Sequence, residues 1–244
     1  MTFEEWLNTA TKRDGSPLAK TTIKHYADGF RITSKEMFEN HIIAKPLEDM
    51  NMYELDLAIS LIMNEQSFIE KDKIGNKMYS NALKRYRCFK YLNTDLGIQE
   101  AAEEAIVKND TTLTITEKET IVKARIGQGS YRDKLIKKYN HSCIMTKVNI
   151  SQVLVASHIK PWAICDNKER IDINNGLLLS ATYDRLFDSG LITFDKTGKL
   201  KISKLISKDN AKKLNIKSGN KYDIKYCNEM DAYLDYHNNV IFVG

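Results

Sequence analysis

The chain has few of the residues that interrupt regular structure. Its 244 residues include only 3 prolines and 11 glycines, which argues against long disordered linkers. It has no apolar run of about 18 residues, the length that a transmembrane helix needs. The first residues have neither a basic region nor an apolar core, so we expect no signal peptide. The composition, 42% hydrophobic and 28% charged, is that of an ordinary globular protein with one large domain or two modest ones.

Cysteine is also scarce. The four cysteines are Cys88, Cys143, Cys165 and Cys227, and no two of them form a Cys-x-x-Cys pair. This spacing gives no sign of a disulfide framework, and a reducing compartment explains it most simply. We therefore expect a cytoplasmic protein.

The net charge of +5 is unevenly distributed. Residues 1–119 contain 16 Lys and Arg against 20 Asp and Glu, a balance of −4, whereas residues 120–244 contain 21 against 12, a balance of +9. A basic C-terminal half suits a polyanionic partner. A lysine-rich genome would produce the same excess, so charge alone leaves both interpretations open.

The N-terminal part has helical patterns. Apolar residues recur at helical spacing over residues 20–37, 55–63 and 79–92, and Thr2 with Glu5 fits a capping box. A Thr-rich stretch near residues 108–116 is a candidate linker. After it, Thr116 and Glu119 fit the capping box of a new helix.

A basic stretch lies between residues 71 and 90. It contains seven lysines and arginines against one acid, Asp72, and tyrosines are interspersed among them. Such cations neutralise phosphates, and helices fit the major groove, so we consider Lys84, Arg85 and Arg87 as nucleic-acid contacts. A solvated face on a core-packed helix explains the pattern equally well.

The C-terminal half shows a mixed pattern of strands and helices. We expect helices over residues 131–139, 182–188 and 230–237, strands over 152–159 and 177–179, and a hairpin made by 191–194 and 200–202. Together with the N-terminal helices, this pattern predicts the α+β class.

Three polar residue types stand at element ends in this half. His158 ends a predicted strand, and a histidine can act as a base near neutral pH. Asn175 precedes an apolar run, and its amide can bind a backbone carbonyl and fix the loop that carries His158. Asp184 and Asp188 share one helix face and offer the oxygen ligands that magnesium prefers. Each also has a structural explanation: a packed histidine, turn chemistry at Asn175, and acids paired with Arg185 or capping a turn.

The order of these residues resembles the HNH nucleases, which have a ββα-metal fold. The similarity covers about residues 124–244 and is closest to a bacterial, restriction-endonuclease-like subgroup. The matching segments are Ile126–Arg132, Cys143–Thr146, Ala156–Trp162, Asn174–Leu179, Tyr183–Asp188, Leu191–Phe194 and Tyr233–His237.

The resemblance implies a metal-dependent endonuclease acting on double-stranded DNA, most simply a sequence-specific type II restriction endonuclease. It implies that His158 activates water, that Asn175 orients this base or joins the metal shell, and that Asp184 is the main ligand of Mg²⁺ or Mn²⁺, with Asp188 as a second. It implies products with a 5′-phosphate and a 3′-hydroxyl. Residues 1–112 then form an α-helical DNA-recognition domain, and residues 113–244 form the nuclease domain.

The sequence departs from the family pattern in two places. Many members have an acidic residue or histidine directly before the catalytic histidine, whereas this chain has Ser157, a poor metal ligand. Many members also hold a structural zinc with four cysteines. Here Cys143 stands alone, with Thr146, Ser180 and Tyr183 where the others would fall, so we expect no structural zinc.

Four cations near the motifs are candidates for gripping phosphate: Arg132, Lys160, Arg170 and Arg185. Because both strands of a duplex must be cut, we expect a homodimer. Two alternatives remain open. The N-terminal domain could read methylated bases, which would make the protein a modification-dependent restriction endonuclease, or the protein could bind DNA without cutting it.

Overall fold

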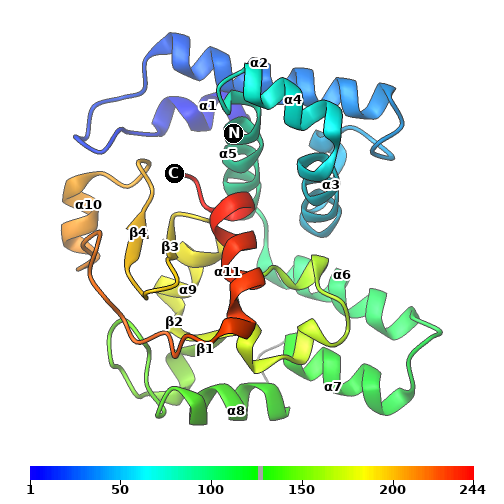
Figure 1. Ribbon diagram of the computed structural model, residues 1–244, viewed down its shortest axis with the longest axis vertical. Coiled ribbons are helices and arrows are strands. Elements are labelled where there is room, and N and C mark those ends of the chain that lie inside the picture. Colours follow the sequence, from blue (N-terminus) through cyan, green and yellow to red (C-terminus); the bar gives the residue numbers. More distant parts are fainter. Residues whose placement is uncertain (126–128) are drawn as a thin grey trace.

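The computed structural model describes residues 1–125 and 129–244, and the start of one motif, residues 126–128, lies outside these ranges. Helices form one end of the molecule, and two small antiparallel sheets with flanking helices lie next to them (Figure 1). The predicted α+β class, with helices preceding the mixed half, is confirmed. Within the described part of the chain, no helix is both long and apolar enough to cross a membrane.

The N-terminal region consists of α1 (Phe3–Thr9), α2 (Lys20–Glu39), α3 (Met52–Asn64), α4 (Gln66–Ile74) and α5 (Met78–Leu92). The apolar spacing correctly predicted α2, α3 and α5, and the capping box of Thr2 and Glu5 at α1 is present. The helices enclose a core of their own, in which Tyr86 of α5 stacks on Phe30 of α2 with 3.7 Å between ring centroids.

Three further helices lead into the C-terminal half: α6 (Leu96–Asn109), α7 (Ile115–Arg125) and α8 (Gly129–Lys138). The cap of α7 corrects one prediction. Thr114 and Glu117 make the reciprocal hydrogen bonds, rather than Thr116 and Glu119. Both pairs have the same spacing, so the pattern alone could not choose between them.

The C-terminal half is built around a hairpin of β1 (Leu154–His158) and β2 (Gly176–Ser180), in which His158 pairs with Gly176. The predicted strand over 152–159 begins later than expected, because residues Ser151–Val153 form a 3-10 turn. Helix α9 (Ala181–Asp188) follows β2 directly and contacts both strands, as α8 also does. The second hairpin, β3 (Ile192–Phe194) with β4 (Leu200–Ile202), has the predicted position.

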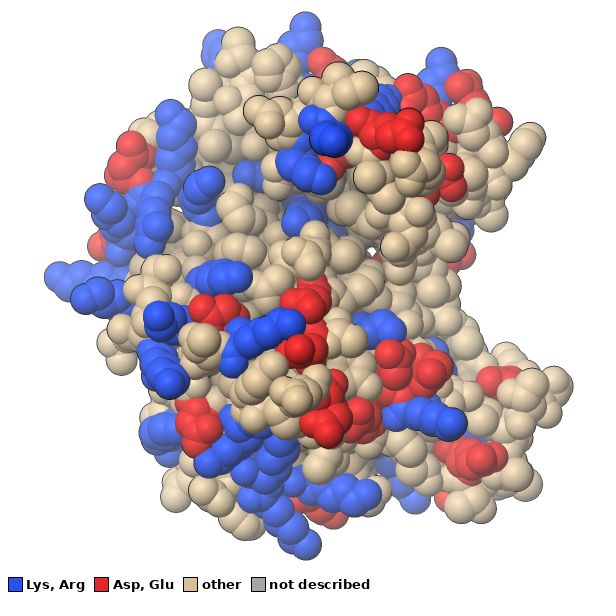
Figure 2. Space-filling view, viewed as in Figure 1, with Lys and Arg blue, Asp and Glu red and all other residues tan. Residues whose placement is uncertain are grey.

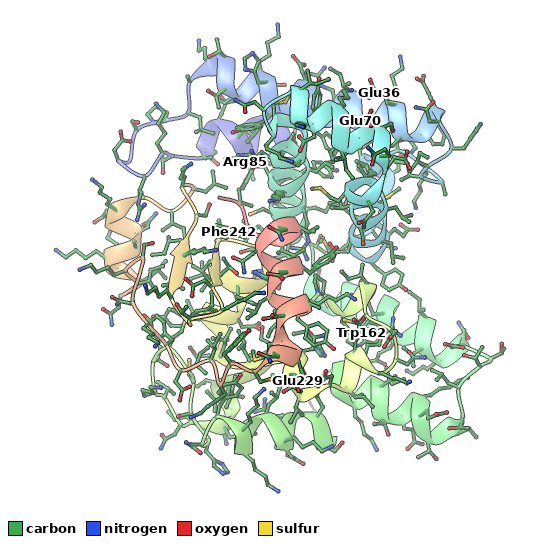
Figure 3. All side chains as sticks on the ribbon, in the orientation of Figure 1. Glu36, Glu70, Arg85, Trp162, Glu229 and Phe242 are labelled. Atoms are coloured by element: carbon green, nitrogen blue, oxygen red, sulfur yellow. The ribbon has the colours of Figure 1, made fainter. Side chains whose placement is uncertain are left out.

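The chain ends with α10 (Lys208–Lys213), α11 (Asp231–Tyr236) and one π-helical turn at His237–Ile241. A second core fills the space between the hairpins, α8, α9 and α11. A third, small cluster joins Val107 of α6, Ile121 of α7 and Trp162, which lies close to α3 and α6 (Figure 3). This cluster crosses residue 112, so the division into two domains there stays a proposal.

Candidate active site

The candidate site lies at the end of β1, where the two faces of the hairpin meet different helices. Adjacent strand residues point to opposite faces. His158 faces α8, with its ring stacked on Tyr131 at 4.7 Å between centroids and 11° between planes. Ser157 faces α9, because its hydroxyl lies 3.4 Å from Asp188 Oδ1. The end of β1 therefore places an imidazole beside a residue that contacts the acidic helix.

The imidazole of His158 is held in a defined orientation. Its Nε2 lies 3.0 Å from the carbonyl oxygen of Arg170. A carbonyl only accepts hydrogen bonds, so Nε2 carries the proton and Nδ1 is the basic nitrogen of the ring. Gly176, opposite His158, keeps the space open, because a Cβ there would lie 2.5 Å from the hydroxyl of Tyr131. A larger residue would displace the ring on which His158 stacks.

Asn175 holds the loop that leaves His158. It is fully buried, and its Oδ1 accepts a hydrogen bond of 2.8 Å from the backbone N–H of Lys160. Its Nδ2 donates to the carbonyl of Glu169 at 3.2 Å and to Cys165 Sγ at 3.2 Å. The predicted bond from the amide to a backbone carbonyl is thus present. Both polar atoms of the side chain are used inside the protein, which favours a positioning role over metal binding.

Asp188 connects α9 to both β1 and the N-terminal helices. Its Oδ2 accepts a hydrogen bond of 3.0 Å from the hydroxyl of Tyr91, at the end of α5. Its backbone oxygen accepts a hydrogen bond of 2.7 Å from Arg87 Nη1. Arg87 is itself buried in an ion pair with Asp56. The carboxylate is therefore fixed from two sides, by α5 and by Ser157 of β1.

Asp184 lies one turn before Asp188 on the same helix and is half-buried. Burial, followed by the negative charges of Asp188 and Asp184, raises the pKa of Tyr91 far above its ordinary value. Asp184 and Asp188 are four residues apart on α9, a spacing that places both on one side of the helix. No set of three His, Cys, Asp or Glu side chains among the described residues forms a metal-binding cluster.

The four cations expected to grip phosphate have partners inside the protein. Arg132 donates to the backbone oxygens of Leu154 and Ser151, and Lys160 pairs with Glu169 at 2.6 Å. These contacts brace the two ends of β1 and its following loop.

The remaining two cations, Arg170 and Arg185, are also committed. Arg170 is buried, with its guanidinium carbon 4.0 Å from the ring centroid of Trp162, so Trp162 anchors this loop. Arg185 lies over the ring of Tyr91 at 4.4 Å and donates to the backbone oxygens of Tyr91 and Leu92. It therefore caps the last carbonyls of α5, a place where positive charge is favourable.

The expected DNA-facing surface on α5 needs correction. Arg85 and Arg87 are 5% and 3% exposed, so this face of α5 is in the core and cannot enter a groove of DNA. Arg87 forms its ion pair with Asp56, and Arg85 packs on Tyr26. Lys84 is half-buried, and this burial lowers its pKa to about 8. The core explanation of the tyrosine pattern holds here: Tyr86 and Tyr91 are both buried.

The position of Cys143 was also of interest from the sequence. Its thiol accepts hydrogen bonds from the backbone N–H groups of Thr146 and Ser180, at 3.5 and 3.3 Å. Tyr183 donates its hydroxyl to the backbone oxygen of Leu214. Thr146 and Ser180, two of the residues expected at the positions of zinc-binding cysteines in other family members, therefore lie beside Cys143.

Two residues of the site were missed by sequence reasoning. Tyr131 lies within the segment Ile126–Arg132 and Tyr91 directly follows the basic stretch, but no pattern in the sequence distinguishes either one. The signal that identifies them is contact with residues far away in the chain, such as Tyr91 with Asp188, and no local pattern contains it.

A comparison with known families matches residues 143–195 to the model of the HNH endonuclease family. The matched segment runs from Cys143 through β1, β2, α9 and β3, and so includes His158, Asn175, Asp184 and Asp188, whereas Tyr91 and Tyr131 lie before it. A comparison with curated proteins found no match.

Proposed function

Because residues 143–195 match the model of the HNH endonuclease family, we propose that this protein is a metal-dependent endonuclease that hydrolyses phosphodiester bonds in double-stranded DNA. More narrowly, we propose a sequence-specific type II restriction endonuclease. The family match carries the proposal, and the contact between Asp188 and Ser157 brings α9 against the strand that ends at His158. Phosphodiester hydrolysis needs a base for water and a counter-charge for phosphate, roles that His158 and the carboxylates of α9 would take.

His158 is the proposed general base. The Nε2–H group donates to the Arg170 carbonyl, so Nδ1 is the atom that takes the proton of the attacking water. The stacking on Tyr131 limits rotation of the ring and keeps Nδ1 in one direction. Asn175 acts through His158: it ties the backbone of Lys160, two residues later, to the loop at Glu169. We therefore propose Asn175 as a positioning residue outside the metal shell.

Asp184 and Asp188 are the residues that would hold Mg²⁺ or Mn²⁺. A bound ion of this kind neutralises charge on the scissile phosphate and the leaving oxygen. Magnesium is commonly held by one or two carboxylates, with water and substrate phosphate completing its shell, so the two carboxylates of α9 fit. Asp188 accepts hydrogen bonds from Tyr91 and Ser157, which hold its carboxylate in one orientation. The proposed products have a 5′-phosphate and a 3′-hydroxyl.

We further propose that residues 1–112 recognise DNA and that the protein acts as a homodimer, because a double-strand break needs two active sites. The buried contacts of α5 with α9 support a close coupling between the two parts. They would transmit a change in the helical region to the carboxylate of Asp188.

Cleavage of plasmid DNA tests the proposal. Purified wild-type protein and His158→Ala are incubated with methylated or unmethylated plasmids of diverse sequence, in magnesium or in EDTA. His25→Ala serves as the matched control, since His25 is an exposed histidine on α2. We expect discrete fragments from the wild type and from His25→Ala in magnesium, and none in EDTA or from His158→Ala.

Each other outcome has a defined meaning. Cutting of the methylated plasmid alone would replace conventional restriction by modification-dependent restriction. Binding without cutting of either plasmid, in magnesium and in manganese, would contradict the nuclease assignment and leave a DNA-binding protein. Full activity of His158→Ala would refute the assigned base.

A further inference from the structure

Two adjoining hollows lie on the surface between the loop that joins α1 to α2 and the segment from β4 to α10. Their volumes are about 490 and about 450 Å³, and both are lined by Arg13 and Lys208. We call them together the basic groove. Its exposed cations are Lys12, Arg13, Lys204, Lys208, Lys212 and Lys217. Lysines and arginines gather along this edge of the molecule, at the left of the view in Figure 2.

The groove is a built feature, because a hydrogen bond joins its two walls. The backbone N–H of Lys208 donates to the carbonyl of Arg13 at 2.9 Å. This bond fixes the loop between α1 and α2 against the first residue of α10, as their neighbouring positions in Figure 1 indicate. Cations from opposite ends of the chain are thereby held on the same surface.

The protein offsets the positive charge of the groove only in part. Within residues 1–125 and 129–244, none of its six exposed cations forms a salt bridge with a carboxylate. Asp14 is the single acid that lines it, and this side chain accepts hydrogen bonds from the backbone N–H and the hydroxyl of Ser16. Like charges held close together repel, and a bound anion relieves the repulsion.

Arg85 forms the floor of the groove and adds a buried charge. It is 5% exposed, and its guanidinium carbon lies 4.1 Å from the ring centroid of Tyr26, which also lines the hollow. Figure 3 shows it on α5. Its Nη1 donates to the carbonyl of Asn81, whereas its buried Nε has no hydrogen-bond partner among the described residues. A buried guanidinium without a counter-charge is costly, and its fork of donors matches an oxyanion.

We propose that the basic groove is a phosphate-binding site, with Arg85 at its floor and Lys204 and Lys208 at its rim. The ligand is a phosphate group, supplied either by the backbone of duplex DNA or by the free ion. The groove shares no lining residue with the candidate active site, so phosphate binding here does not depend on the proposed cleavage.

Binding measurements in EDTA test the proposal without any cleavage. The variant Lys204→Gln/Lys208→Gln removes two exposed charges, so its fold is not at risk. The control, Lys24→Gln/Lys73→Gln, removes two exposed lysines of α2 and α4 that line neither hollow. Affinity for a fluorescent random-sequence duplex is measured over a range of salt. The slope of log K against log salt is negative, and losing two phosphate contacts should reduce its magnitude by about 1.8.

Inorganic phosphate is the second probe, read as a rise in the thermal unfolding midpoint of the full-length protein. Arg85→Gln is included in this arm, with its unfolding curve without phosphate as the reference. A shallower salt dependence of duplex binding in the groove variant, but not in the control, supports the site and identifies the DNA backbone as the source of the phosphate. An unchanged slope, with stabilisation by phosphate that both groove variants lose, supports a site for the free ion.

The proposal is overturned if the groove variants match the wild type and the control with both probes. This result would leave the proposed nuclease activity intact, because that activity is tested at His158. Conversely, failure of plasmid cleavage would leave the binding result unaffected.

Discussion

The ion pair between Asp56 of α3 and Arg87 of α5 provides the sharpest prediction. Its two hydrogen bonds measure 2.6 and 3.1 Å, and the residues are 4% and 3% exposed. In Asp56→Asn the shape is kept but the negative charge is lost, which leaves a buried cation without its counter-charge. Breaking a buried pair in this way costs about 3–5 kcal/mol of unfolding free energy. For a domain with a total stability of about 5–15 kcal/mol, this is a large fraction.

The assay is urea denaturation followed by circular dichroism, with equal slopes required before midpoints are compared. The matched control is Asp28→Asn, which breaks an ion pair with Arg31 of 2.7 Å on the surface, with side chains 35% and 64% exposed. We expect this control to lose about 0–1 kcal/mol, since solvent screens exposed pairs.

A double variant separates the charge from the packing. Asp56→Leu/Arg87→Met removes both charges and keeps apolar volume, so it should recover most of the loss. It also removes the bond from Arg87 to the Asp188 carbonyl, so about 1 kcal/mol should remain lost. The reasoning is refuted if Asp56→Asn loses no more stability than Asp28→Asn.

Two further predictions concern the C-terminal half. Asn175→Ala removes three hydrogen bonds of a fully buried amide. We expect plasmid cleavage to fall at least about tenfold, while the far-UV circular dichroism spectrum remains that of a folded protein. Unchanged cleavage would contradict the positioning role of Asn175. Burial lowers the pKa of His237 to about 3, so the unfolded chain binds a proton below about pH 6.5 that the folded protein does not. The free energy of unfolding should therefore fall as the pH drops from about 6.5 towards 3, by up to about 1.4 kcal/mol per pH unit. In urea titrations at several pH values, His237→Gln should show a weaker dependence of stability on pH.

The sequence predicted the elements around the site well, because the signals involved are local. Strand alternation, the Asn-Gly turn before β2 and the i, i+4 spacing of Asp184 and Asp188 each depend on a few neighbouring residues. They located β1, β2 and α9 to within about two residues of their bounds. The cap of α7 shows the limit of such signals, since Thr114 and Thr116 both satisfy the pattern and the folded chain uses only the first.

Charge patterns were a poorer guide than hydrophobic ones. A run of cations predicts a solvated or DNA-facing surface only if the helix leaves that face exposed. In α5 the faces are shared among α2, α3 and the π-helical turn near the C-terminus, so Arg85 and Arg87 are buried. Asp56 and Arg87 are 31 residues apart in the sequence, so no local pattern indicates the ion pair that offsets the cost of burying Arg87.

The sequence by itself determined the order of strand, loop, strand and helix that puts His158, Asn175 and the two aspartates in succession, because backbone periodicity and turn chemistry are encoded locally. Only the tertiary structure decided which groups meet: Tyr91 with Asp188, Tyr131 with His158, and the loop after α1 with α10. These contacts arise because apolar faces from distant segments are buried together, and burial then fixes the partner and the charge environment of every polar side chain it includes.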